Sequence, residues 1–132
     1  MPIKSVKSLV DAARTEITII PTKQVIAMMN DPDVMLVDIR DIRELDRDGR
    51  IPGAFHAPRG MLEFWVDPQS PYHKPALSTG KKMIFFCASA WRSALTVKTL
   101  QDMGVTNIFD LEGGFTAWRA AGGPIDKPEP RG

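Results

Sequence analysis

The chain has 132 residues, of which 43% are hydrophobic, and its 17 Lys and Arg and 16 Asp and Glu give a net charge of +1. This length suits one domain with a substantial hydrophobic core. The nearly balanced charge excludes a strong field for nucleic acid or an anionic membrane, and we expect neither as a partner. One cysteine excludes an internal disulfide and a four-thiolate metal site, and we expect no metal and no cofactor.

The N-terminal segment predicts an amphipathic helix, because Val6, Leu9, Val10 and Ala13 recur at helical spacing. We assign residues 1–16 to an extension that packs across one end of the sheet. The segment lacks the apolar centre of a signal peptide. No stretch reaches the roughly 18 apolar residues of a membrane span. We therefore expect a cytoplasmic protein.

Residues 17–126 alternate short apolar strands with helices, and we assign them to one domain followed by a tail at 127–132. This alternation predicts an α/β fold with a mainly parallel sheet of about five strands and helices on both faces. In such sheets ligands bind at the carboxyl ends of the strands. The strands are expected at residues 17–20, 34–38, 54–56, 83–86 and 107–110, and the later helices at 40–46, 93–103 and 115–121, after one that contains Val25, Ile26 and Met29.

The stretch from 58 to 81 is irregular and rich in proline. Connections of this length are often functional. Phe64, Trp65 and Tyr72 either form a wall of a pocket or anchor the loop to the core. His73 is expected to be a solvated loop residue.

Cys87 follows a buried strand and opens a short loop that leads into a helix. Such a loop directs successive backbone N–H groups inward and adds the positive end of the helix dipole, which favours a reactive thiolate. The alternative is that Cys87 is only a small buried apolar side chain. The loop reads Cys87-Ala88-Ser89-Ala90-Trp91-Arg92.

The loop resembles the C-x4-R active-site loop of the rhodanese domain. Three other segments are similar to motifs of the same family and occur in the same order. They are residues 36–40 (LVDIR), residues 49–54 (GRIPGA, with Arg50 where histidine is usual) and residues 111–124, which contain the closing GG, W and G-P. The resemblance extends from about residue 18 to residue 124.

The resemblance implies a rhodanese-like fold and a sulfurtransferase activity. Cys87 would take sulfane sulfur from a donor such as thiosulfate, carry it as a persulfide and pass it to cyanide, to a thiol or to an acceptor protein. No cofactor would take part. The substrate-binding residues would be the five that follow the cysteine: Ala88, Ser89, Ala90, Trp91 and Arg92.

Charged residues near the loop have several interpretations. Arg92 either binds an anionic donor and stabilises the thiolate, or folds back and fixes the loop. Asp38, at the end of a neighbouring strand, is a candidate to fix the loop or Arg92 from behind. Arg40 and Glu44 are four residues apart, so we expect a surface ion pair between them.

The loop departs from the family pattern at two positions. Ala90 stands where glycine is usual and would be strained if the backbone there needs a positive φ. Trp91 is bulky where polar residues are common and could select the donor or acceptor.

Two other functions remain open. A Cdc25-type cysteine phosphatase is the rival enzyme, but its loop resembles C-x5-R, one residue longer, which admits a tetrahedral phosphate. A non-catalytic binding module of the same fold is the second alternative. Retention of both Cys87 and Arg92 argues against it.

Overall fold

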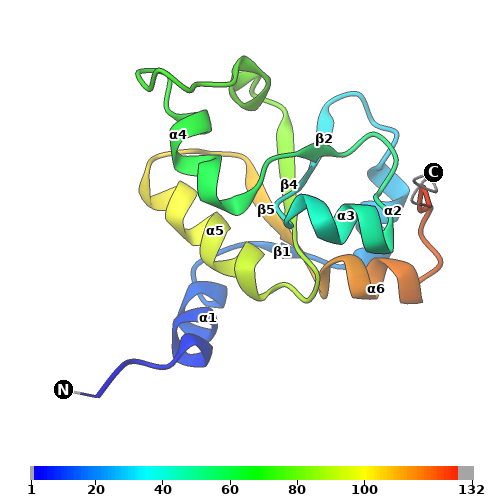
Figure 1. Ribbon diagram of the computed structural model, residues 1–132, viewed down its shortest axis with the longest axis horizontal. Coiled ribbons are helices and arrows are strands. Elements are labelled where there is room, and N and C mark those ends of the chain that lie inside the picture. The colour runs from blue at the N-terminus through cyan, green and yellow to red at the C-terminus, as the bar shows by residue number, and fades with distance from the viewer. Residues whose placement is uncertain (1, 128–132) are drawn as a thin grey trace.

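The structure is a computed structural model that describes residues 2–127 (Figure 1). The expected tail at 127–132 therefore lies, except for Lys127, outside the described residues. The strands are β1 (Ile19–Ile20), β2 (Val34–Asp38), β3 (Phe55–His56), β4 (Lys82–Phe86) and β5 (Ile108–Leu111). The helices are α1 (Val6–Arg14), α2 (Thr22–Met28), α3 (Ile42–Asp48), α4 (Leu62–Val66), α5 (Trp91–Asp102) and α6 (Gly114–Ala120), with short 3-10 turns η1 (Arg59–Met61) and η2 (Pro75–Ser78).

The five strands form one parallel sheet in the order β1-β5-β4-β2-β3. All five therefore have their carboxyl ends at the same edge, where β4 leads into Cys87 and β2 ends at Asp38. In Figure 1, α5 and α4 lie on one side of the sheet, and α2, α3 and α6 lie on the other. The predicted fold class is confirmed.

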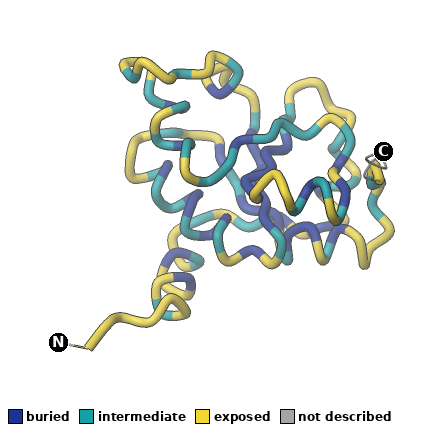
Figure 2. The backbone as a smooth tube through the Cα atoms, in the orientation of Figure 1, coloured by how far each residue is buried: buried dark blue, intermediate teal, exposed yellow. Residues whose placement is uncertain are grey.

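The alternation of side chains along the strands divides the interior into two cores, drawn dark blue at the centre of Figure 2. The α5-side core contains Val37, Phe85, Cys87, Leu62, Val97 and Ile108. The α6-side core contains Leu36, Ile84, Phe86, Val25, Phe115 and Trp118. Successive residues of β4 thus point to opposite faces, which places the thiol on the face that α5 covers.

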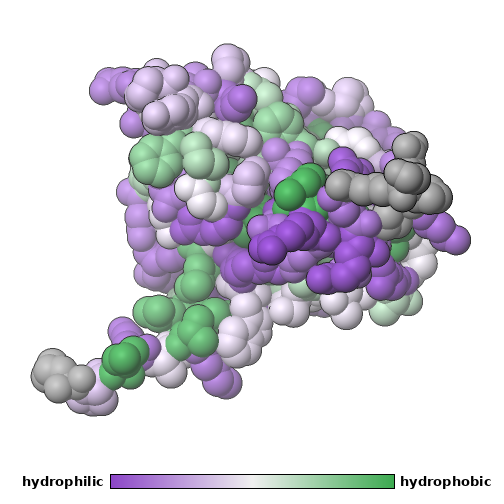
Figure 3. Space-filling view, viewed as in Figure 1, coloured by the Kyte–Doolittle hydropathy of each residue, from purple (hydrophilic) through white to green (hydrophobic). Residues whose placement is uncertain are grey.

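Helix α1 packs chiefly against α5, through the buried side chains of Val10 and Ala13, instead of across an end of the sheet. Ser5 caps its start by accepting a hydrogen bond from the N–H of Ser8 at 3.1 Å. Its outer side is apolar and exposed, at Val6 and Leu9 (Figure 3). No helix within the described residues is long and apolar enough to cross a membrane.

Helix α3 begins later than the sequence predicts, because Asp41 is its N-cap and forms a capping box with Glu44. Arg40 therefore precedes the helix and is fully buried. The expected surface pair between Arg40 and Glu44 is wrong. Arg40 instead pairs with Asp38, and Glu44 pairs with Arg92.

Arg40 forms a buried ion pair with Asp38, at 2.8 Å between Nη2 and Oδ2 and 3.0 Å between Nε and Oδ1. The same Nη2 donates to the carbonyl of Gly49 at 2.9 Å. The guanidinium carbon lies 4.1 Å from the centre of the Phe115 ring. Arg40 thus links β2 to the segment before β3 and to α6.

Removal of Asp38 should destabilise the fold severely. Asp38→Ala leaves the Arg40 charge buried without its carboxylate, which costs about 3–5 kcal/mol. The control, Asp11→Ala, breaks the exposed pair with Lys7, and such pairs contribute about 0–1 kcal/mol. Urea unfolding of both variants measures the difference. Equal losses in the two variants would contradict this account of the buried pair.

Candidate active site

Cys87 lies directly after β4 and is almost completely buried. Its Sγ accepts a hydrogen bond from the backbone N–H of Ser93 at 3.4 Å and lies 3.6 Å from the Ser93 Oγ. Ser93 is in the first turn of α5, so the sulfur meets the amino end of this helix as the sequence predicts. The backbone N–H and the amino end of the helix favour a negative charge on sulfur, whereas the Ser93 Oγ accepts a hydrogen bond from the thiol.

The loop turns into α5 at Ala90, which has φ 69° and ψ 11° in the left-handed region. Alanine in this conformation is strained by about 1–2 kcal/mol, and glycine is not. Its carbonyl accepts hydrogen bonds from the N–H of Ala94 and from Nη2 of Arg14, both at 3.4 Å. The strain expected at this position is therefore present, and α1 contacts the loop through Arg14.

Helix α6 holds the start of the loop from the other side. The N–H of Phe115 donates to the carbonyl of Cys87 at 2.8 Å, and the N–H of Thr116 donates to that of Ala88 at 3.0 Å. Gly114 permits this approach, because a Cβ on it would lie 2.6 Å from the Cys87 carbonyl oxygen and its φ is +62°. The GG of the closing motif therefore has a physical role in placing the thiol.

Arg92 makes a two-pronged ion pair with Glu44 of α3, with both nitrogen–oxygen distances at 2.9 Å. This hydrogen bond is the largest of the effects that hold the pKa of Glu44 below its usual value and raise that of Arg92. The Cys87 sulfur also contributes to raising the pKa of Arg92. Arg92 connects the loop to α3 and provides a positive charge beside Cys87.

The other predicted site residues differ in exposure. Ser89 and Trp91 are exposed, Ala88 is partly exposed and Ala90 is buried. The Trp91 side chain is 42% exposed at the start of α5, where a molecule approaching the loop can meet it. Asp38 lies at the same edge of the sheet, and its carboxylate accepts from Arg40.

The aromatic residues of the 58–81 segment separate into two pairs. Phe64 and Tyr72 are exposed and meet edge to face, with their ring centres 6.3 Å apart. Trp65 meets Phe55 in the same way at 6.4 Å and packs against the α5-side core. The contacts of Trp65 are those expected of an anchor for the loop. His73 lies 2.9 Å from the Trp65 carbonyl oxygen through Nδ1.

Sequence reasoning did not single out Asp110, which is 1% exposed in β5. Neither of its carboxylate oxygens has a hydrogen-bond partner within the described part of the chain. Burial raises its pKa to about 6, although the Ser93 hydroxyl and the Arg14 guanidinium act in the opposite direction. The available signal was one charged residue inside an apolar strand.

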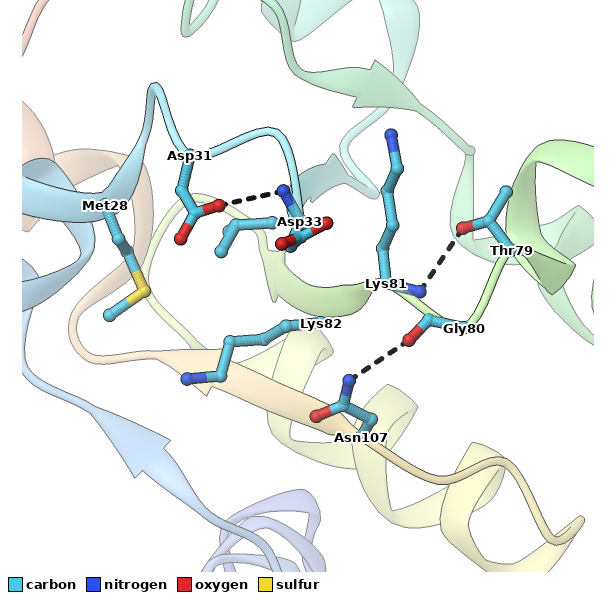
Figure 4. Close-up of a pocket in the computed structure, with 9 residues that line it drawn as sticks. Met28, Asp31, Asp33, Thr79, Gly80, Lys81, Lys82 and Asn107 are labelled. Atoms are coloured by element: carbon cyan, nitrogen blue, oxygen red, sulfur yellow. Dashed lines mark hydrogen bonds between the residues drawn. The ribbon is translucent and has the colours of Figure 1, made fainter.

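A separate hollow lies at the opposite edge of the sheet, before β2 and β4 begin (Figure 4). Asp31, Asp33, Lys81 and Lys82 line it, and the amide of Asn107 donates to the Gly80 carbonyl at 3.3 Å. None of the predicted site residues lines this hollow. The hollow is therefore separate from the predicted site around Cys87.

Comparison with known proteins identifies the family of the chain. Residues 21–121 match the model of the rhodanese-like domain. The chain therefore belongs to the rhodanese-like domain family. Helix α1 lies outside the matched residues.

Solved structures and named relatives agree with this assignment. A protein of unknown function from Rhodopseudomonas palustris, named a possible tyrosine phosphatase, is 51% identical, with a TM-score of 0.90 over 96% of this chain and 99% of that one. A polysulfide-sulfur transferase homodimer from Wolinella succinogenes is 30% identical, with a TM-score of 0.69 over 92% of this chain and 86% of that one.

Among the curated relatives, a sulfurtransferase from Allochromatium vinosum is 31% identical over 74% of this chain and 82% of its own length. The chain spans only 61% of the length of an uncharacterised Synechocystis relative, which is also 31% identical. The sulfurtransferase relatives place the chain in a family that includes such enzymes.

Replacement of Ala90 by glycine should stabilise the protein. Ala90→Gly removes the left-handed strain but frees the unfolded backbone, so we expect a net gain of about 0.5–1 kcal/mol. The control is Ala94→Gly inside α5, which should lose about 1 kcal/mol. Urea unfolding measures both. A loss of stability in Ala90→Gly would show that the left-handed conformation is not strained.

Neutralising Asp110 should stabilise the protein in a pH-dependent manner. An acid whose pKa is raised on folding, here from 3.8 to about 6, lowers the unfolding free energy as pH rises through this window. Asp110→Asn should therefore be more stable than the parent above pH 6 by about 1–3 kcal/mol, with the gain vanishing below about pH 4. Urea unfolding at both pH values tests this, with exposed Asp102→Asn as the control. An equal effect at both pH values would contradict the expected titration.

Proposed function

We propose that the protein is a sulfurtransferase that carries sulfane sulfur on Cys87. The observation that carries the proposal is the short turn between β4 and α5, which brings the Ser93 N–H to 3.4 Å from the sulfur. Small side chains at Ala88, Ser89 and Ala90 leave the backbone of this turn free to surround one additional atom. Membership of a family with named sulfurtransferases supports the same function.

The reaction would proceed in two displacements. The Cys87 thiolate attacks the outer sulfur of a donor such as thiosulfate, a sulfur–sulfur bond forms, and sulfite leaves with the electron pair of the broken bond. A thiolate or cyanide then attacks the outer sulfur of the persulfide and restores the Cys87 thiolate. No metal or cofactor enters either step.

The charge beside the loop influences the choice of donor. Arg92 can attract an anionic donor, but both of its bonded nitrogens are held by Glu44, which balances much of its charge. Long-range attraction of a small anion should therefore be weak, and short contacts within the loop should dominate recognition. The exposed ring of Trp91 adds an apolar surface at the entrance, which suits a polarisable sulfur chain or a protein thiol.

A phosphatase is the second candidate, because the 51% identical Rhodopseudomonas protein is named a possible tyrosine phosphatase. The spacing of the loop argues against it. Four residues separate Cys87 from Arg92, whereas five separate the cysteine from the arginine in the Cdc25-type phosphatase loop. A shorter loop has fewer inward amides for the three outer oxygens of a phosphate.

Incubation with thiosulfate, and in parallel with polysulfide, followed by intact mass measurement tests the proposal. We expect the mass of one sulfur atom on the parent and none on Cys87→Ser, since no second thiol is present. Arg92→Gln should slow sulfur uptake about tenfold or more, because a charged hydrogen bond contributes about 1.5–3 kcal/mol.

The matched control is Arg47→Gln, which removes an arginine whose partner is the surface Asp48. It should leave the uptake rate unchanged. Hydrolysis of an aryl phosphate without sulfur uptake would replace the proposal by the phosphatase. If neither reaction occurs, a binding module is the correct interpretation.

A further inference from the structure

Asp110 and Cys87 lie on the same face of the sheet. Along β5, Ile108 belongs to the α5-side core, and Asp110 follows two residues later, so both point toward α5. In the sheet register Asp110 is paired with Phe85, and Cys87 follows Phe85 by two residues on the neighbouring strand. The carboxyl and the thiol therefore share the space beneath the start of α5.

Ser93 occupies this space between them. Its side chain is fully buried in the first turn of α5, and its Oγ lies 3.6 Å from the Cys87 sulfur. The Ser93 hydroxyl also lies near enough to the Asp110 carboxyl to lower its pKa. The Asp110 oxygens have no hydrogen-bond partner within residues 2–127, so they can accept from this hydroxyl when it turns toward them.

The surrounding groups favour a single negative charge in this space. From α1, the Arg14 guanidinium acts on Asp110, while the sheet neighbours Phe85 and Ile19 are apolar. Arg92 is bound to Glu44, and the Cys87 sulfur contributes to raising the pKa of Arg92. Two adjacent buried anions would repel each other, so a proton should remain on either the sulfur or the carboxyl.

We propose that Cys87, Ser93 and Asp110 form a buried proton relay, in which Asp110 receives the proton that Cys87 loses. The S–H bond breaks as the Ser93 oxygen takes this proton, and the original O–H bond of Ser93 breaks as the Asp110 carboxylate takes the other. The step transfers protons only, and no group is oxidised or reduced. The negative charge moves from the carboxylate to the sulfur, where the Ser93 N–H and the loop can stabilise it.

The relay gives the site a base without an adjacent histidine. In the proposed sulfur transfer, on which this role rests, Asp110 is a positioning residue that acts through Ser93. The pKa of Asp110, about 6, is high enough for a carboxyl to accept a proton from a neighbour near neutral pH. Because the groups are coupled, their titration belongs to the pair and not to either residue alone.

The test follows the ultraviolet absorbance of the thiolate, and the rate of iodoacetamide alkylation, as functions of pH. In the parent we expect two steps in the alkylation rate, the first at the pH at which the Asp110 carboxyl titrates, about 6. Asp110→Asn and Ser93→Ala should each lose this first step. Each should also lower the alkylation rate at about pH 7 by tenfold or more, since general bases contribute about 10²–10⁴-fold.

The controls separate the relay from a structural effect. Ser93→Ala keeps the backbone N–H that bonds the sulfur and so removes only the hydroxyl. The double variant should lose no more than either single variant, because the two groups act in one chain. Asp102→Asn, a surface carboxyl paired with Lys98, should titrate as the parent does. Should Asp110→Asn not fold, Ser93→Ala still decides the question.

Three results would overturn the relay. They are an unchanged thiolate titration in Ser93→Ala, a thiolate that forms at lower pH in Asp110→Asn, and independent, additive effects of the two substitutions. The assays contain no sulfur donor, so they are independent of the proposed function. A parent that shows both steps but takes up no sulfur would retain the relay and refute the sulfurtransferase.

Discussion

The backbone reversal between β4 and α5 is the constraint on which the site depends. A strand that runs to the carboxyl edge of the sheet must turn into a helix within a few residues, and the last residue before the helix, Ala90, is left-handed. Amides of α6 hold the first carbonyls of this turn at 2.8 and 3.0 Å, where only a glycine at position 114 allows the approach. The thiol is thereby fixed against the first turn of α5, independently of its own side-chain contacts.

Charge around this turn is arranged in local pairs. Arg40 with Asp38 fixes the neighbouring strand end, and Arg92 with Glu44 connects the loop to α3. A chain with a net charge of +1 has no large field with which to gather an anionic substrate. The reactivity that we propose for Cys87 would therefore arise from short-range groups: the Ser93 N–H, which donates to the sulfur, and the proposed relay through the Ser93 hydroxyl to Asp110. We expect the unpaired carboxyl of Asp110 to reduce stability at neutral pH, a cost that is common at functional sites.

Much of the fold was predictable from the sequence. The apolar runs before Cys87 and Asp38, the glycine and proline boundaries and the four ordered motifs define a parallel sheet with the thiol at its carboxyl edge. The ends of helices were harder to predict. Helix α3 was expected to start at residue 40, but the capping box between Asp41 and Glu44 makes it start at Ile42. Local signals therefore predict elements better than their boundaries.

The partners of the charged residues were not predictable in the same way. Glu44 binds Arg92, 48 positions away, and spacing within one helix suggested a different partner. Asp110 and Ser93 come together only through the register of β5 with β4 and the packing of α5 on that face. Such contacts arise only in the folded sheet, so residue patterns within one segment of the sequence do not predict them.

The most direct measurement of the central claim is a crystal structure of the protein after reaction with a sulfur donor. The account predicts one additional sulfur atom bonded to the Cys87 Sγ and enclosed by the backbone N–H groups of the turn up to Ser93, with the turn in its present conformation. An unmodified thiol beneath a bound tetrahedral oxyanion, or a turn that must open to admit the sulfur, would contradict it.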